Sequence, residues 1–183
     1  MAPPVEQRVV FSAQAEGLLR GLGADVKGRL KERLKAAELD PDRPLPPGWP
    51  AARLREWLDI ASEELSPELP TTEAHRLLGR RFIEGWQGTL IGAASAPFLK
   101  LLGTRRALER LTRAFRTGDN YSQTSVTFPS ATSALVTVNS EPLVHYTAGI
   151  LDAGLAMMKV KGHVTIERVV GGVMVFRVEW EAS

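Results

Sequence analysis

The hydrophobic pattern of the chain changes its period once, near Gly118, and this change limits the folds that the chain can adopt. Before Gly118, apolar residues recur at the spacing of amphipathic helices. After it they alternate with polar residues, as at Thr124, Val126 and Phe128, which indicates strands with one buried face. We therefore expect helices first and a sheet second.

In the first part the pattern predicts helices over 12–22, 25–37, 51–65, 71–86 and 104–118. An N-terminal arm, 1–11, precedes them, and the proline-rich segment 40–50 is expected to be a surface linker within the domain. The second part predicts strands over 124–128, 134–138, 163–170 and 173–180, with a helix over 143–158. Because 183 residues suit one domain, we expect a single α+β domain over 1–183: an N-terminal helical bundle followed by a strand-strand-helix-strand-strand antiparallel sheet.

Composition excludes several classes of protein. The chain has no cysteine, which excludes a disulfide framework, a thiolate metal site and a cysteine nucleophile. Its first residues lack the pattern of a secretory signal, so we expect a cytoplasmic protein. The formal net charge of +2 is too small to indicate nucleic-acid binding by itself.

Residues 85–99 form an uncharged stretch, "GWQGTLIGAASAPFL", in a chain with 24% charged residues. Fifteen helical residues span roughly 22 Å, less than the roughly 30 Å of a bilayer core, so we expect no membrane span. Its glycines match neither a phosphate loop nor a dinucleotide fingerprint. We expect a central buried helix here, with the lining of a hydrophobic pocket or a dimer face as alternatives.

Residues able to carry chemistry are sparse. His75, His145 and His163 have no metal-ligand spacing, and no nucleophile elbow occurs, so we expect neither a metal site nor an enzyme. A candidate anion-binding stripe has i, i+4, i+7 spacing and consists of Arg106, Arg110 and Arg113. Since no aromatic stacking platform accompanies it, we expect no nucleic-acid binding.

Four strings of the sequence resemble a family of uncharacterised proteins of about this length, expanded into many paralogues in myxobacteria: "VVFSAQAEGLLRGL", "AHRLLGRRFIEGWQGTLIGAA", "LLGTRRALERLTRAFR" and "GILDAGLAMMKVKGHVTIERVVGGVMVFRVEW". The order of elements is similar to a wider fold group. That group includes the haem-nitric-oxide-binding domains, the vinyl-reductase small-molecule-binding domains and subunits of vesicle-tethering complexes. The resemblance implies a domain that holds haem, a small hydrophobic ligand, an acyl chain or a partner subunit.

The chain departs from the haem-binding branch of that group. The Tyr-x-Ser-x-Arg clamp of that branch would fall on Tyr121, but Gln123 and Ser125 stand at its next two positions. The helix expected over 104–118 has no histidine to serve as an axial ligand. The resemblance therefore implies a domain without haem, and we expect no cofactor.

These observations predict a noncatalytic small-molecule-binding or sensory domain with an apolar pocket between the uncharged helix and the sheet. Its candidate ligand-binding residues are Phe82, Trp86, Leu90, Ile91, Phe98, Leu151, Leu155, Phe176 and Trp180. The alternative is a protein–protein interaction module that forms a homodimer or docks a partner through the same apolar faces. The sequence identifies neither a ligand nor a partner.

Overall fold

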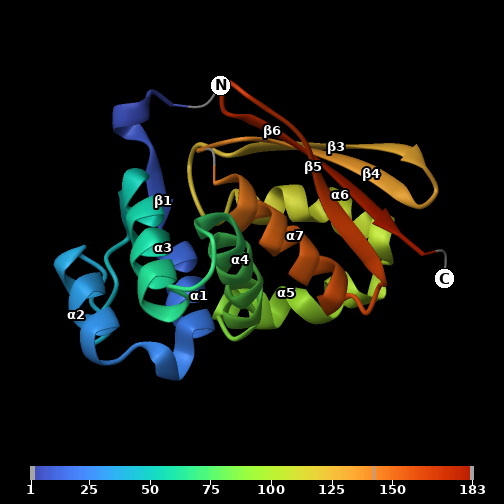
Figure 1. The fold of residues 1–183 in the computed structure, drawn as a ribbon. Helices are drawn as coiled ribbons and strands as arrows, with labels where there is room; N and C mark the ends of the chain where they lie inside the picture. Colours follow the sequence, from blue (N-terminus) through green and yellow to red (C-terminus); the bar gives the residue numbers. More distant parts are fainter. Residues whose placement is uncertain (1–2, 142, 182–183) are drawn as a thin grey trace.

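The structure is a computed structural model that describes residues 3–141 and 143–181, without the side chains of residues 111–114. Helices cover one face of a curved four-stranded antiparallel sheet (Figure 1). The predicted α+β class is confirmed, with the helical bundle first and the sheet second.

The helices agree closely with the predicted ranges. They are α1 (Ser12–Leu22), α2 (Gly28–Ala36), α3 (Ala52–Leu65), α4 (Thr71–Gln87), α5 (Leu90–Leu101), α6 (Thr104–Phe115) and α7 (Val144–Met157), with 3-10 turns at Val5–Gln7 and Gly23–Asp25. One start differs, because the helix predicted from Asp25 begins at Gly28. Asp25 does not cap it; its carboxylate instead pairs with Arg81 of α4.

The sheet contains β3 (Gln123–Ser130), β4 (Ser133–Asn139), β5 (Gly162–Val170) and β6 (Val173–Trp180), in the order β3-β4-β6-β5. The turn between β5 and β6 is the predicted glycine pair, and both glycines have positive φ angles, 57° and 83°. In β6, alternate side chains face inward, and Met174, Phe176 and Val178 are fully buried. One face of the sheet therefore packs on the helices.

Two short strands were not predicted. β1 (Val9–Phe11) lies in the N-terminal arm and pairs with β2 (Gly48–Pro50) at the end of the proline-rich linker. Phe11 N–H also donates to the Gly118 carbonyl, at an N···O distance of 2.8 Å. The arm therefore joins the linker to the segment that leads into β3.

Helix α4 lies at the centre of the helical layer, packed between α1 and α7 (Figure 1). Two glycines allow the close crossing of α4 and α7. A Cβ atom on Gly79 would lie 2.1 Å from the Tyr146 carbonyl oxygen, and one on Gly149 would lie 2.0 Å from the Arg76 carbonyl oxygen. The backbones of the two helices are thus in direct contact.

The uncharged stretch contains the end of α4, a turn and most of α5. Thr89 caps α5, since its Oγ1 accepts the Gly92 N–H at 3.0 Å. The prediction of a central buried helix is wrong for α5, where Leu90 and Leu101 are 89% and 84% exposed. The reason is that α4 already occupies the centre, so α5 packs through one face only. Within the described residues, no helix has the length and apolarity to cross a membrane.

Candidate functional site

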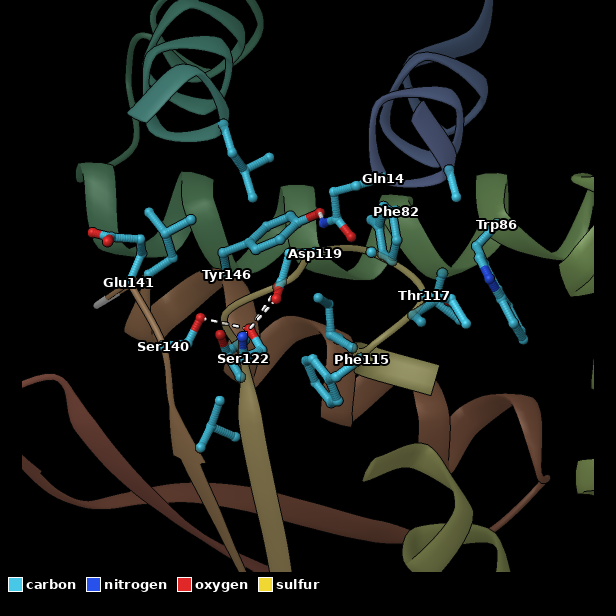
Figure 2. Close-up of a pocket in the computed structure, with 18 of the residues that line it drawn as sticks. Gln14, Phe82, Trp86, Phe115, Thr117, Asp119, Ser122, Ser140, Glu141 and Tyr146 are labelled. Carbon is cyan, nitrogen blue, oxygen red and sulfur yellow. Dashed lines mark hydrogen bonds between the residues drawn. The ribbon is translucent and has the colours of Figure 1, made fainter. Parts of the chain in front are cut away.

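A cavity of about 80 Å³ lies where the helical layer meets the first strands of the sheet (Figure 2). Its walls come from α1, α3, α4, α7, the segment 115–122, the end of β4 and the segment that follows it. The described chain has two clusters of buried apolar residues, one among the helices and one between α7 and the sheet. The cavity contains side chains from both clusters, for example Phe82 from the first and Val138 from the second.

Most of the lining is apolar. Its larger side chains come from α4, α6 and α7 and are Phe82, Ile83, Trp86, Phe115, Ile150 and Met157. The three from α4 reach the cavity together, because residues 82, 83 and 86 lie on the same side of that helix. Apolar walls with a few fixed polar groups are typical of small-molecule sites.

The polar groups of the cavity include the Tyr146 hydroxyl. Tyr146 is 2% exposed, and burial raises the pKa of its phenol well above the ordinary value. Gln14 of α1 donates an N–H to the Tyr146 oxygen at 2.9 Å (Figure 2). This bond uses the oxygen as an acceptor. The hydroxyl proton is therefore left to donate to a second partner.

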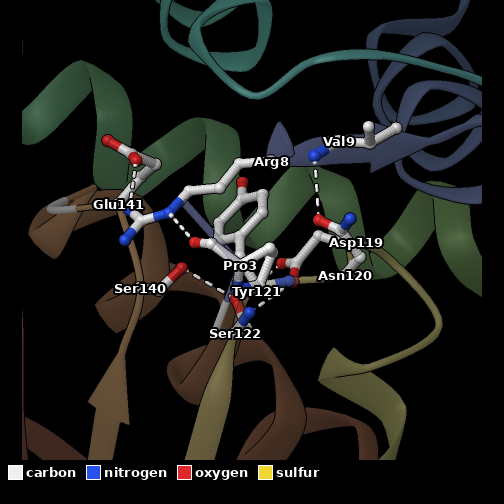
Figure 3. Close-up of polar contacts among 9 residues, drawn as sticks. All are labelled: Pro3, Arg8, Val9, Asp119, Asn120, Tyr121, Ser122, Ser140 and Glu141. Carbon is white, nitrogen blue, oxygen red and sulfur yellow. Dashed lines mark hydrogen bonds and ion pairs between the residues drawn. The ribbon is translucent and has the colours of Figure 1, made fainter. Parts of the chain in front are cut away.

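Asp119 holds the turn that leads into β3 (Figure 3). Its carboxylate accepts the backbone N–H groups of Tyr121 and Ser122 at 2.9 and 2.6 Å, and the Ser122 hydroxyl at 2.6 Å. Burial raises the pKa of the Asp119 carboxyl, and the three hydrogen bonds oppose that rise. Ser122 Oγ also lies 2.7 Å from Ser140 Oγ, which ties this turn to the end of β4.

The N-terminal arm covers the outer side of this turn (Figure 3). Arg8 Nη1 pairs with Glu141 Oε1 at 2.7 Å, and the Arg8 guanidinium lies 5.8 Å from the centre of the Tyr121 ring. Burial raises the pKa of the Tyr121 phenol, with a smaller contribution from Asp119. The polar side of the cavity is thus cross-linked, whereas most of the remaining lining is apolar.

The structure brings two of the nine predicted ligand-binding residues, Phe82 and Trp86, into the cavity. Four others are buried or half-buried against α7 and the sheet: Leu151, Leu155, Phe176 and Trp180. The remaining three lie on the exposed face of α5: Leu90, Ile91 and Phe98. The nine residues therefore do not form one pocket, and a ligand-binding role for those outside the cavity stays a prediction.

The candidate anion-binding arginines lie on α6. Arg106 and Arg110 are exposed, and the side chain of Arg113 lies outside the described residues. Arg110 stands over the ring of Phe98, with its guanidinium carbon 4.7 Å from the ring centre. Anion binding by this stripe stays a prediction.

The polar lining of the cavity was missed at the sequence level. Gln14 and Tyr146 are separated by 132 positions, and nothing in the pattern pairs them. A signal did exist for Asp119, because Asp followed three positions later by Ser before a strand is typical of a side-chain-capped turn. Within the described residues, no three His, Asp or Glu side chains are placed to bind a metal ion.

The helical layer, the sheet and their order along the chain define the fold class of the H-NOX domains. An oxygen-binding H-NOX domain related to soluble guanylate cyclases aligns with a TM-score of 0.69 and 16% identity, covering 93% of this chain and 92% of that one. An H-NOX structure concerned with activation aligns with a TM-score of 0.70 and 16% identity, covering 94% of this chain and 97% of that one. A mutant H-NOX domain of T. tengcongensis aligns with a TM-score of 0.65 and 16% identity, covering 92% of this chain and 94% of that one. At these identities the likeness shows a shared fold.

The chain belongs to the family described as "Protein of unknown function (DUF2378)", whose model matches residues 8–181. A comparison with curated proteins gave no match. The resemblance found in the sequence is therefore confirmed as to a family of uncharacterised proteins and as to the haem-nitric-oxide-binding fold.

One of the similar structures concerns haem distortion in the H-NOX family, so the fit of haem to this chain needs a test. The cavity of about 80 Å³ is far smaller than the roughly 300–1,000 Å³ of ordinary ligand pockets. Helices α5 and α6 contain no histidine, cysteine, methionine or tyrosine, and no histidine lines the cavity. Helix α5 also packs tightly on α4, because a Cβ on Gly92 would lie 1.7 Å from the Trp86 carbonyl oxygen. The residues present do not fit haem.

Proposed function

We propose that this chain is a noncatalytic sensory domain that binds a small neutral molecule in the cavity between the helices and the sheet, without haem. The ligand has an apolar body of a few heavy atoms and one hydrogen-bond acceptor. A cavity of about 80 Å³ supports this size, since an apolar cavity of about 150 Å³ accommodates benzene. The proposal places the domain in the cytoplasm, as expected from the sequence, and in a family confined to myxobacteria.

The observation that carries the proposal is the buried Tyr146 hydroxyl, whose oxygen accepts from Gln14 and whose proton can donate to a second partner in the cavity. A buried donor without a partner costs about 1–3 kcal/mol, which an acceptor on a ligand would recover. The lining contains no lysine, arginine or histidine, which favours a neutral ligand over an anionic one. The half-buried Asp119 carboxylate in the lining disfavours an anion further.

The noncatalytic part of the proposal rests on the polar groups of the lining. The Ser122 hydroxyl donates to Asp119 within a turn whose backbone N–H groups bind the same carboxylate. No histidine is present there to act as a base for a nucleophile. These groups are arranged to stabilise a turn.

A second function is an interaction module, which the exposed apolar face of α5 supports. Native mass spectrometry of the purified protein separates the two functions. We expect a protein mass with an additional small, noncovalently bound mass that is lost on mild activation. A ligand-free multimer would contradict the sensory proposal in favour of the module, and a Soret absorption band with stoichiometric iron would contradict its haem-free part.

A further inference from the structure

Helix α5 exposes large apolar side chains along its length. Leu90, Ile91, Phe98 and Leu101, here called the α5 ridge, are 89%, 44%, 48% and 84% exposed. They are four of the eight large hydrophobic side chains that are exposed in the described part of the chain. The residues between them on the exposed side are small, including Ala94, so the ridge is uninterrupted by charge. Such a concentration on one helix indicates a surface that is covered in use.

A basic surface adjoins the α5 ridge. Its exposed cations are Lys100, Arg105, Arg106, Arg110 and Arg116, here called the α6 basic face. The sequence from 90 to 116 contains six cations and one acidic residue, Glu109, so its net charge is +5. The α6 basic face and the α5 ridge are continuous, because the guanidinium carbon of Arg110 lies 4.7 Å from the centre of the Phe98 ring.

The arginines of α4 differ from those of the α6 basic face, because they form ion pairs within the molecule. Arg76 and Arg80 both pair with Asp152 of α7, at 2.7 and 2.9 Å, and Arg81 pairs with Asp25. Those cations hold helices together. On α6, Arg105 lies over the ring of Phe128 and Arg110 over the ring of Phe98, but both side chains remain exposed. Their charged groups are therefore accessible to something outside the chain.

The charge of this surface decides between possible occupants. A second copy of the chain would bring two α6 basic faces together across a symmetric contact, and like charges would oppose it. The surface therefore requires an occupant that is apolar and anionic. The α5 ridge is a convex helix face with largely exposed leucines at both ends. Such a face can insert among lipid acyl chains, which need no preformed groove to receive it.

We propose that the α5 ridge and the α6 basic face form a site for peripheral docking on an anionic lipid surface. Helix α5 lies in the plane of the interface, with its apolar side chains among the acyl chains and the α6 arginines at the headgroups. Each cation near such a surface increases binding about fivefold, and the effect is lost within a Debye length. The site is independent of the cavity, so it stands or falls separately from the sensory proposal.

Vesicle flotation tests the proposal. The full chain is mixed with vesicles of phosphatidylcholine alone or with about one-third phosphatidylserine, at low salt and at about 0.15 M salt. We expect at least tenfold tighter binding to the anionic vesicles, weakening as salt increases. Equal binding to both vesicles, or none to either, would overturn the proposal.

Three variants locate the site. Leu90→Ser with Leu101→Ser should weaken vesicle binding at least tenfold, and so should Arg106→Glu with Arg110→Glu. The matched control is Val169→Ser with Val170→Ser, an exposed apolar pair at the β5–β6 turn that should leave binding unchanged. Circular dichroism checks that each variant is folded. If the control weakened binding as much, or if Leu90→Ser with Leu101→Ser dissociated a dimer of the protein, the lipid assignment would be wrong.

Discussion

At the scale of single residues, the cavity depends on polar pairs whose members lie far apart in the sequence. Gln14 meets Tyr146 across 132 positions, and Arg8 meets Glu141 across 133. Hydrophobic periodicity indicates which faces are buried, but it does not indicate which two elements bring their polar residues together. This is why Phe82 and Trp86 could be predicted from an apolar helix face while Tyr146 could not.

His75 gives the stability of the protein a pH dependence. It is buried beside Asp59, with 2.9 Å between Nε2 and Oδ1, and burial lowers its pKa from the ordinary 6.5 while Asp59 opposes the shift. The unfolded chain therefore binds the proton more readily. The stabilising effect is fully present above pH 6.5 and is lost as the pH falls through the lowered folded pKa.

We expect His75→Gln to reduce the loss of unfolding free energy between pH 7.5 and pH 5.5 by up to about 1 kcal/mol. Urea denaturation at the two pH values measures it. His163→Gln is the matched control, because the His163 side chain is 67% exposed and should change this difference little. The account of His75 fails if its variant keeps the pH dependence of the wild type.

At the scale of elements, length decides what can be predicted. Helices of 11 to 17 residues, such as α1 and α4, give several periods of the apolar pattern, and their bounds were predicted to within a few positions. Strands β1 and β2 have three residues each, too few to show a period. The position of α5 was predicted, but its burial was not, because sequence does not show that α4 takes the central place.

The crossing of α4 and α7 gives an element-scale prediction. Gly79→Ala should lower the unfolding free energy by about 3 kcal/mol or more, because the added Cβ would lie 2.1 Å from the Tyr146 carbonyl oxygen and no flexible side chain can yield. Gly88→Ala, whose Cβ would come no closer than 3.3 Å to its neighbours, is the control. Urea denaturation of both variants measures the difference. Equally small losses of unfolding free energy in the two variants would show instead that α4 and α7 have room to separate.

At the scale of the whole molecule, two apolar clusters meet at the cavity, and the N-terminal arm bridges them. Val9 accepts the Asn120 N–H at 3.2 Å, and Asn120 Oδ1 accepts the Val9 N–H at 2.9 Å. The order of helices and strands could be predicted from the change of period. The cavity could not, since it depends on how the two clusters fail to fill the space between them.

The central claim is that the Tyr146 hydroxyl donates to a small neutral ligand in this cavity. Amide chemical shifts measured by NMR during titration with acetone and with propane test it most directly, since the two probes share a three-carbon skeleton and differ by one carbonyl oxygen. We expect shifts at cavity residues, tighter binding of the ketone, and a loss of about five- to tenfold in ketone affinity with Tyr146→Phe while propane affinity is unchanged. Equal losses for both probes, or no shifts at cavity residues with either, would contradict the claim.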